Sequence, residues 1–479
     1  MAQTRFQTLL TDPRVAEARA LLSAALQDAR ASVPAAIVPP DPALQGGYQA
    51  MMERFGEARG RGLFFPYLGS GLGRGAFVEL ADGSVKLDFI TGIGAHPFGH
   101  SPMELLDARL DSALSDGVMQ GNLQQNPESL HFSERLLAEA NRSDVPNPAP
   151  PIDGKPRFRH CFLTTTGAMA NENGAKVLFQ ARAPASRVLA FSHCFAGRSL
   201  GMSWVTDKHA GRIGVPKTLD VDYVPFFDPE RPERSSQHAL AVLERHLERY
   251  PKQHAFFILE LVQGEGGYYT GTPAFFRALL ERCQQAGVGV LVDEIQSFGR
   301  TPQLFAFQHF GLDDLVDVVT VGKLTQACAT LFTHAVNPGA GLLSQTFTGA
   351  TSAIRAGDEV VRALRERGHA GPGGRNQAIY DRFTAHLLRL QAAHPAWVAG
   401  PFGIGAMLGF TPFGGDSKLA NRLLTRLYDL GLMGFNAGSD PTRLRFLPPL
   451  LVVTDAEIDF AAELLERGLT EIAAEANLA

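Results

Sequence analysis

The most constraining feature of this sequence is the alternation of short apolar runs with helical patterns between two connectors, at residues 145–156 and 368–376. The runs VGVLVDE and VDVVTV are rich in β-branched residues and short, so they predict strands buried on both faces. The segment TPAFFRALLERCQQAG predicts a helix that Thr272 can cap, with Pro273 at its first position and Gly287 at its end. Such alternation predicts an α/β fold with a mostly parallel sheet and helices on both faces.

The two ends of the chain follow other patterns. The first 85 or so residues predict helices and then a small sheet around GAFVELADGSVKLDFI, while the region after about Gly371 mixes helices with short strands. We therefore expect residues 1–85 to contribute to a smaller α+β domain, residues 86–350 to form a large domain, and residues 351–479 to form the C-terminal small domain.

Composition excludes several kinds of partner. The net charge is -5 and basic residues are scattered, which is not the pattern of a nucleic-acid-binding protein. The four cysteines form no CxxC pair, so we expect reduced thiols and no metal site. The N-terminal residues lack the apolar core of a signal peptide, and no apolar run is long enough to span a bilayer. We expect a cytoplasmic protein that does not bind membranes.

Polar residues follow several of the predicted strands, at the sheet edge where parallel sheets bind ligands. The strand HCFLTTT leads through Thr166 and Gly167 into a helix, whose unpaired N–H groups favour an anion such as a phosphate. Simple N-capping by Thr166 would also explain this threonine. The strand VGVLVDE ends in Asp293 and Glu294, and a buried carboxylate needs either an arginine or a ligand nitrogen as its partner.

A lysine, Lys323, follows the strand VVTV. Desolvation would lower its pKa and free the amine for imine chemistry, whereas a lysine that reaches solvent is the simpler alternative. The turn in ILELVQGEGG adds Glu260, Gln263 and Glu265, which in a loop would ordinarily be solvated. An anion site, a carboxylate for a ring nitrogen and a lysine for an aldehyde together fit one cofactor, pyridoxal 5'-phosphate.

The sequence resembles the class III (omega) aminotransferases from about Leu87 to the C-terminal helix. The resemblance is carried, in the family's order, by LDFITGIGAHPFGHSP, TTGAMANENGAKV, FAGRSLG, ELVQGEGG, DEIQSFGRT, QTFTG and RFLPPLLVVTDAEID. It implies the pyridoxal-phosphate fold type I, which is aspartate-aminotransferase-like, with a mostly parallel seven-stranded sheet in the large domain and a smaller α+β domain.

The resemblance also implies a role for each matching residue. Lys323 would form the Schiff base with the cofactor and move the substrate proton, Asp293 would pair with the pyridine nitrogen, and Gln296 would lie near the phenolic oxygen. The other cofactor residues would be Thr166, Gly167 and Ala168 around the phosphate, Phe195 stacked on the ring, and Thr346, which reaches the phosphate of the partner subunit. A homodimer with an active site shared between subunits is therefore expected.

The residues expected to bind substrate are Arg198 and Arg445, for carboxylates, and Glu265, which would pair with Arg445 when the donor has no carboxylate there. The segments VGKLTQACA and GRSLGMSWVTDKHAGRIGVPK look most like lysine ε-aminotransferases. The resemblance thus implies transamination of an ω-amino acid or a diamine-type donor, similar to lysine or ornithine, with 2-oxoglutarate as acceptor.

Two other functions remain open on the same fold. One is a different pyridoxal-phosphate reaction, by an amino-acid 2-epimerase, a decarboxylating transaminase or an aminomutase; Arg198, Glu265 and Arg445 favour transfer, because an epimerase needs no acceptor site. The other is a non-catalytic homologue, which Lys323 and Asp293 argue against. A dehydrogenase is disfavoured because no GxGxxG follows a strand in the right context.

Overall fold

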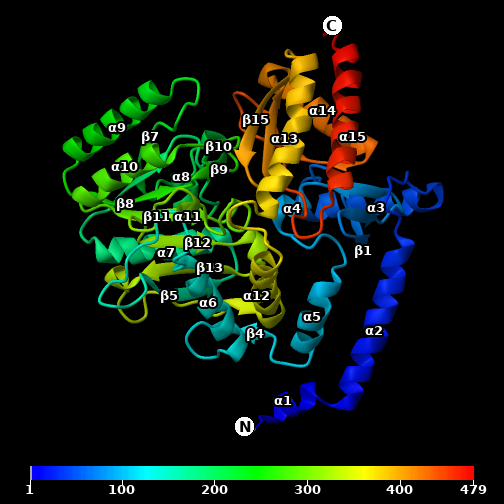
Figure 1. Cartoon of the computed structure of the whole chain (residues 1–479), viewed down its shortest axis with the longest axis horizontal. Coiled ribbons are helices and arrows are strands. Elements are labelled where there is room, and N and C mark those ends of the chain that lie inside the picture. Colours follow the sequence, from blue (N-terminus) through cyan, green and yellow to red (C-terminus); the bar gives the residue numbers. More distant parts are fainter. Residues whose placement is uncertain (1–2, 479) are drawn as a thin grey trace. The chain divides into compact units, whose positions relative to one another are not determined.

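A computed structural model of the protein describes residues 3–478 (Figure 1). The chain forms two compact units. The large unit consists of residues 116–377 and 402–407, and the small unit consists of the residues up to 115, residues 378–401 and those from 408 onward. The division of the chain at residues 85 and 350 stays a prediction.

The large unit is built on a seven-stranded sheet, as predicted. Its order is β5 (Phe158–Thr164), β13 (Cys328–Thr333), β12 (Val318–Val321), β11 (Gly289–Glu294), β8 (His254–Leu259), β6 (Arg187–Phe191) and β7 (Asp220–Val224). Neighbouring strands are parallel except for β13, which is antiparallel to both β5 and β12. The predicted α/β fold with a mostly parallel sheet is confirmed.

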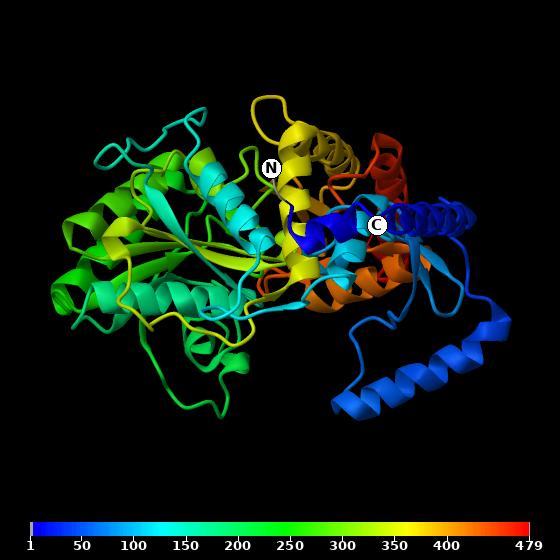
Figure 2. The ribbon, with the colours of Figure 1, turned by 90° about the horizontal axis from the view of Figure 1, so that it is seen from below.

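Helices cover both faces of this sheet. They are α6 (Pro127–Ala140), α7 (Gly167–Ala181), α8 (Leu200–Val205), α9 (Pro232–Arg249), α10 (Pro273–Gln285), α11 (Ala306–His309) and α12 (Thr351–Glu366). Figure 2 shows α7 and α6 on opposite sides of the sheet. Every residue of β8 and β11 is buried. Side chains of β8 alternate between the faces, with Phe256 and Ile258 packed in the core beneath α7. On the opposite face Phe191 of β6 stacks with Phe275 of α10.

The predicted helix signals are confirmed in detail. Thr272 caps α10, since its side chain accepts the N–H of Phe275 at 3.2 Å. Gly287 follows the helix with φ of +74°, a conformation that glycine adopts without strain. At α7, the side chain of Thr166 accepts the N–H of Met169 at 3.2 Å, so the helix begins where the loop after β5 ends.

Two short strand pairs complete the large unit. They are β4 (Val118–Met119) with β14 (Gly349–Ala350), and β9 (Val262–Gln263) with β10 (Tyr269–Thr270). Each pair is antiparallel. The pair β9–β10 closes the turn that contains the ELVQGEGG motif.

The small unit contains two four-stranded sheets. The first has the order β1 (Gly69–Arg74), β2 (Phe77–Leu80), β3 (Val85–Asp88) and β17 (Leu432–Met433); the second has the order β15 (Val398–Ile404), β16 (Met407–Pro412), β19 (Arg443–Phe446) and β18 (Phe435–Ala437). Strands β2 and β3 form the small sheet predicted around GAFVELADGSVKLDFI, and β3 pairs in parallel with β17. The last residues of β15 and the first of β16 are grouped with the large unit.

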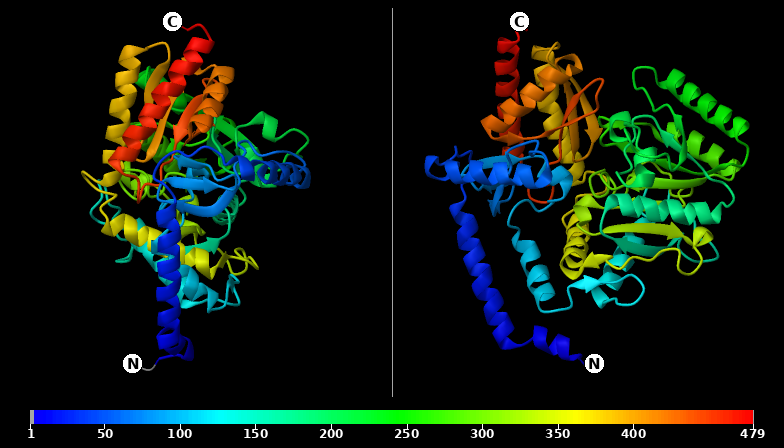
Figure 3. Two further views of the ribbon diagram at one scale, coloured as in Figure 1. Left: turned by 90° about the vertical axis from the view of Figure 1, so that its right-hand side faces the viewer. Right: turned by 180° about the vertical axis from the view of Figure 1, so that it is seen from behind.

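Eight helices are described with this unit. They are α1 (Arg5–Leu10), α2 (Pro13–Ser32), α3 (Pro42–Arg59), α4 (Thr91–Gly94), α5 (Leu106–Ala113), most of α13 (Arg375–Ala393), α14 (Ser417–Leu430) and α15 (Asp455–Glu475). Neither α1 nor α2 buries any residue, and Arg19 of α2 pairs with Asp111 of α5. Figure 3 shows α2 as a long helix. Within residues 3–478, no helix is both long and apolar enough to cross a membrane.

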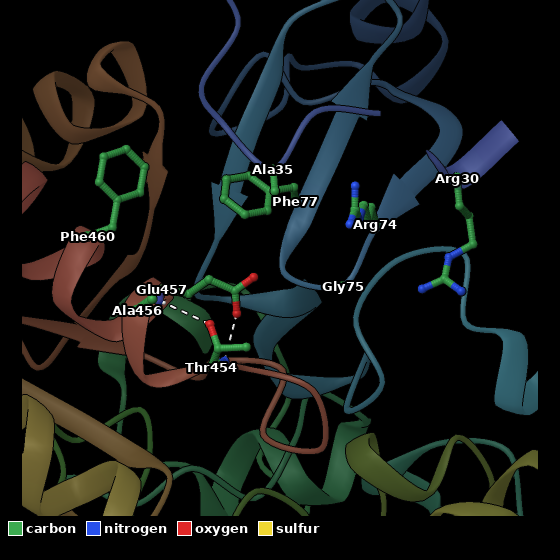
Figure 4. Close-up of a pocket in the computed structure, with 9 residues that line it drawn as sticks. All are labelled: Arg30, Ala35, Arg74, Gly75, Phe77, Thr454, Ala456, Glu457 and Phe460. Carbon is green, nitrogen blue, oxygen red and sulfur yellow. Dashed lines mark hydrogen bonds between the residues drawn. The ribbon is translucent and has the colours of Figure 1, made fainter. Parts of the chain in front are cut away.

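The small unit also contains a hollow of about 530 Å³ near the start of α15. Figure 4 shows Arg30, Arg74 and Phe77 on its walls, together with Glu457 and Phe460 of α15. The Glu457 carboxylate is engaged in capping the helix, because it accepts the N–H of the N-cap residue at 2.7 Å. None of the predicted site residues lines this hollow.

Candidate active site

The start of α7 lies against the residue that follows β11. A Cβ atom on Gly167 would lie 2.8 Å from Cγ2 of Ile295, so the close approach of these two segments requires a glycine. The loop after β6 lies against the same helix turn, because a Cβ on Gly197 would lie 2.7 Å from Cβ of Ala168. Gly197 also has φ of +128°. The predicted phosphate site at Thr166–Ala168 is therefore in contact with the segments that carry Phe195 and Asp293.

Asp293, at the end of β11, is 7% exposed and both of its carboxylate oxygens are hydrogen-bonded. Oδ1 accepts the N–H of Ile295 at 2.9 Å, and Oδ2 accepts the side-chain amide of Asn171 at 2.6 Å. Burial raises the pKa of Asp293 to about 6, while these hydrogen bonds and the charge of Lys323 oppose the rise. Near neutral pH the carboxylate is largely ionised and suited to a protonated ring nitrogen.

Lys323 follows β12 and opens the short 3-10 helix η3 (Lys323–Thr325). Its φ is +48°, which is uncommon for a residue other than glycine, asparagine or aspartate. Strained backbone of this kind persists where the surrounding structure imposes it, and it clusters at functional sites. The side chain is half-buried, and its charge lowers the pKa of both Asp293 and Glu260. The structure thus brings the predicted lysine and its predicted acidic partner to one sheet edge.

Phe195 is half-buried and carries two cations near its ring. Cζ of Arg198 lies 5.3 Å from the ring centroid and Nζ of Lys208 lies 5.9 Å from it. The backbone N–H of Phe195 donates to Oε1 of Glu260 at 2.9 Å. The aromatic residue predicted to stack on the cofactor is thus fixed at its backbone and flanked by positive charge.

Glu260 is buried, contrary to the expectation of a solvated turn carboxylate. It lies directly after β8, is 7% exposed, and accepts the N–H of Phe195 through Oε1 and the N–H of Gly264 through Oε2 at 3.0 Å. Burial, followed by the charge of Asp293, raises the pKa of Glu260 to about 8. Satisfying two backbone donors from separate loops is the physical reason for its burial.

Gln296 is 5% exposed and lies against the same turn. A Cβ on Gly264 would lie 2.6 Å from the amide atoms of Gln296, so the turn and the segment after β11 are in close contact. Glu265 is the next residue of the turn, and its Oε2 lies 3.9 Å from Nζ of Lys208. Only 16% of the Glu265 side chain is exposed. Glu265, the carboxylate predicted to bind substrate, therefore lies beside Lys208, a cation that the sequence did not indicate.

Thr346 lies on a different loop of the large unit, and Arg445 belongs to the small unit. Thr346 is exposed on the loop before β14, whose neighbouring Gln345 accepts a hydrogen bond from Thr164 at 2.7 Å. Arg445 is a fully buried residue of β19 in the small unit, with Cζ 5.7 Å from the ring centroid of Phe435. The roles predicted for both residues stay predictions.

Asn171 and Lys208 are candidate functional residues that sequence reasoning did not single out, and the burial of Glu260 was not expected. Asn171 lies inside the quoted TTGAMANENGAKV motif, and Glu260 lies inside ELVQGEGG, so their positions were available as signals. Their contacts were not, because the hydrogen bonds that bury them come from distant segments. Lys208 follows a short helix without any pattern that would mark it.

The assembled residues fit pyridoxal phosphate in their chemistry. The N–H groups at the start of α7 suit a phosphate, and Gly167 and Gly197 let the neighbouring segments approach that helix start closely. Asp293 suits the ring nitrogen, Phe195 offers an aromatic face, and Lys323 supplies an amine.

Comparisons with known proteins agree with this arrangement. Residues 70–469 match the family Aminotransferase class-III. An acetylornithine aminotransferase from Lactococcus lactis is 30% identical over 396 residues, which cover 80% of this chain and 92% of the relative. A 5-aminovalerate aminotransferase from Pseudomonas aeruginosa is 28% identical over 70% of this chain and 79% of its own length.

Solved structures show the same likeness. A lysine aminotransferase from M. tuberculosis superimposes with a TM-score of 0.76 at 25% identity, over 88% of this chain and 99% of that one. Because the family match extends over most of the sequence, the chain belongs to the class III aminotransferases, enzymes that work with pyridoxal 5'-phosphate.

Proposed function

We propose that the protein transfers the terminal amine of an ω-amino acid or diamine-type donor, similar to lysine or ornithine, to an oxo acid, with 2-oxoglutarate as the acceptor. One observation carries this proposal: carboxylate and cationic side chains lie side by side at Phe195. Glu265 lies 3.9 Å from Nζ of Lys208, and Arg198 and Lys208 both approach the Phe195 ring. A site edge with both signs of charge suits a donor with an amine at one end and a carboxylate at the other.

The names of the relatives support the same substrate class. Acetylornithine, 5-aminovalerate and lysine are all named as substrates of similar proteins. Each of these molecules carries a carboxylate and an amine separated by a carbon chain. A donor of this general shape is the common feature that we propose for the present chain.

Each residue of the site has a proposed task in this reaction. Pyridoxal phosphate, when bound, supplies a ring that accepts electrons from the donor carbon. The first N–H groups of α7 bind its phosphate, and the Asp293 carboxylate holds a proton at the ring nitrogen. Lys323 Nζ would take the proton from the donor carbon as general base and then, as general acid, deliver it to the cofactor instead of returning it to that carbon. Because Asp293 is buried, little water can compete with the ring nitrogen for its carboxylate.

The first experiment is an absorbance titration of the purified protein with pyridoxal phosphate. Lysine, ornithine, N-acetylornithine, 5-aminovalerate, 4-aminobutyrate and alanine are added one at a time. We expect one of the terminal amines to abolish the visible absorbance of the bound cofactor, and 2-oxoglutarate to restore it. Loss of absorbance with alanine alone, or no response to any amine, would contradict the proposed donor class. The Lys323→Ala variant is the control, since it removes the proposed base.

A second experiment tests the charged site edge. Glu265→Gln removes one charge without changing the shape, and we expect unequal effects on the donor and acceptor half-reactions, measured separately. Glu244→Gln is the matched control, because Glu244 pairs with Arg282 at 2.6 Å on α9 and α10. Equal effects on both half-reactions would mean that Glu265 does not distinguish donor from acceptor.

We also propose that the protein acts as a homodimer. The loop that carries Thr346 supports this: Phe347 is 47% exposed, and Leu123, in the same unit, is 89% exposed. Large exposed apolar side chains beside a predicted cofactor residue suit a subunit interface. Light scattering of the protein loaded with cofactor should give twice the chain mass of 51.7 kDa. A mass equal to one chain would contradict the shared active site.

A further inference from the structure

A line of three buried side chains leads from β12 to the Asp293 carboxylate. Thr320, on β12, donates its hydroxyl to Oδ1 of Asn171 at 2.8 Å. Asn171, on α7, donates its Nδ2 group to Oδ2 of Asp293 at 2.6 Å and to the carbonyl of Ala196 at 2.8 Å. Thr320 is 0% and Asn171 1% exposed, so water does not compete for these hydrogen bonds.

The three partners fix the orientation of the Asn171 amide. Asp293 and the Ala196 carbonyl are both acceptors, so they require the NH₂ group of Asn171 to face them. A flipped amide would place Oδ1 against two oxygens. The hydroxyl of Thr320 then occupies the remaining position by donating to Oδ1. The amide is thus locked as a donor toward the carboxylate.

The Asp293 carboxylate is fixed in turn. Its two oxygens are held from different directions, Oδ1 by the backbone of Ile295 and Oδ2 by Asn171. Rotation of the carboxylate would break both hydrogen bonds. Asn171 also donates to the carbonyl of Ala196, the residue after Phe195, so a single amide connects the loop that carries Phe195 with the Asp293 carboxylate.

We propose that Asn171, locked by Thr320, is a positioning residue that keeps the Asp293 carboxylate ionised and oriented toward the cofactor. The inference rests on the role proposed above for Asp293. Burial opposes ionisation of this carboxylate, and the hydrogen bond from Asn171 is one of the interactions that favour its charged form. Asn171 acts through Asp293 and need not touch the cofactor or substrate.

The chain offers a matched pair of variants for testing this. Thr320 and Thr330 are directly opposite each other on β12 and β13, both are 0% exposed, and both donate to α7 at 2.8 Å. Thr330 donates to the carbonyl of Ala170, which is not part of the line to Asp293. Thr320→Val and Thr330→Val therefore remove equivalent buried hydrogen bonds, and only the first releases Asn171.

The measurements are the dissociation constant of pyridoxal phosphate from the apoprotein and the pH dependence of the bound cofactor's absorbance. A hydrogen bond to a charged group corresponds to roughly 10- to 100-fold in an equilibrium constant, so we expect Asn171→Leu to weaken cofactor binding by about that factor. Thr320→Val should weaken it about three- to tenfold and shift the absorbance pH profile. Thr330→Val should leave the dissociation constant within about twofold of the wild-type value and the absorbance pH profile close to that of the wild type. It should lose about as much thermal stability as Thr320→Val.

Asp293→Asn serves as the reference and separates the two levels of the argument. If Asp293→Asn leaves cofactor affinity unchanged, the role proposed for Asp293 is wrong. If it weakens binding strongly while Thr320→Val and Thr330→Val behave alike, Asp293 keeps its role and the inference about Asn171 is overturned. Should Asn171→Leu fail to fold, the comparison of the two threonine variants still decides the question.

Discussion

Replacing Gly264 by alanine tests whether the turn after β9 holds Gln296 in place. The added Cβ would lie 2.6 Å from the amide carbon, nitrogen and oxygen of Gln296. Non-bonded contacts of this kind are favourable at about 3.5 Å or more, so the amide must move by about 1 Å. Because Gln296 is only 5% exposed, its amide must make this movement against packed neighbouring atoms.

The expected size of the effect follows from this displacement. Overpacking a core position costs about 1–3 kcal/mol of the free energy of unfolding, which in a unit of this size lowers the melting temperature by about 2–10 °C. A misplacement of about 1 Å near the reacting atoms costs about 100-fold in rate. We therefore expect Gly264→Ala to lower kcat/KM about 100-fold with the best donor, measured by steady-state kinetics beside thermal unfolding.

Gly271→Ala is the matched control for this prediction. Its Cβ would lie 2.8 Å from ring atoms of Phe275 and Phe276, a similar steric conflict that does not involve Gln296. We expect a comparable fall in melting temperature and a kcat/KM close to that of the wild type. If both variants lose activity equally, or if Gly264→Ala keeps full activity, the position of Gln296 does not depend on this turn.

Three further predictions concern catalysis and the pH dependence of stability. Lys323→Ala should still bind pyridoxal phosphate, seen by equilibrium dialysis, but show no detectable transfer to 2-oxoglutarate; turnover at the wild-type rate would contradict its role as base. Asp88 is buried, yet the hydrogen bond from His100 at 2.9 Å and two backbone N–H groups hold its pKa below the usual range. Asp88→Asn should lower the free energy of unfolding by about 3–5 kcal/mol at pH 7, measured by urea denaturation, and the deficit should shrink as the pH falls below about 4, because protonation then removes the wild-type contribution. Burial raises the pKa of Asp313 to about 7, so the wild-type protein loses stability from this residue as the pH rises from about 4 to 7. The free energy of unfolding of Asp313→Asn, relative to that of the wild type, should therefore be higher at pH 8 than at pH 5. If this difference between variant and wild type is the same at both pH values, Asp313 is not the group responsible.

Much of the large unit could be predicted from local signals. β-Branched residues predict buried strands such as VGVLVDE, and capping residues predict helix starts such as those at Thr272 and Thr166. Both signals act within a few residues of the chain. The antiparallel direction of β13 has no such local signal. The positions of Lys323 and Asp293 at one sheet edge followed from the rule that parallel strands present their carboxyl ends together.

The finer geometry of the site depends on contacts between distant segments. Glu260 is buried because the backbones of Phe195 and Gly264 donate to it, and neither donor is visible in the turn sequence itself. The same holds for Asn171, whose amide orientation is set by Thr320 and Asp293. Sequence patterns identify such residues as polar and as lying in glycine-containing segments. Whether the side chain is solvated or buried depends on a hydrogen-bond partner that only the tertiary fold brings near.

The parallel pairing of β3 with β17 has a consequence for how the chain is made. Leu87 pairs with Leu432 and Asp88 with Met433, so the first sheet of the small unit draws its strands from opposite ends of the sequence. During synthesis the strand β3 emerges early, and its edge at Leu87 and Asp88 stays unpaired until the whole large unit has left the ribosome. Open strand edges invite pairing with other chains. The large unit is thus inserted between two strands of one sheet, and the nascent N-terminal sheet keeps an unpaired edge until β17 is made.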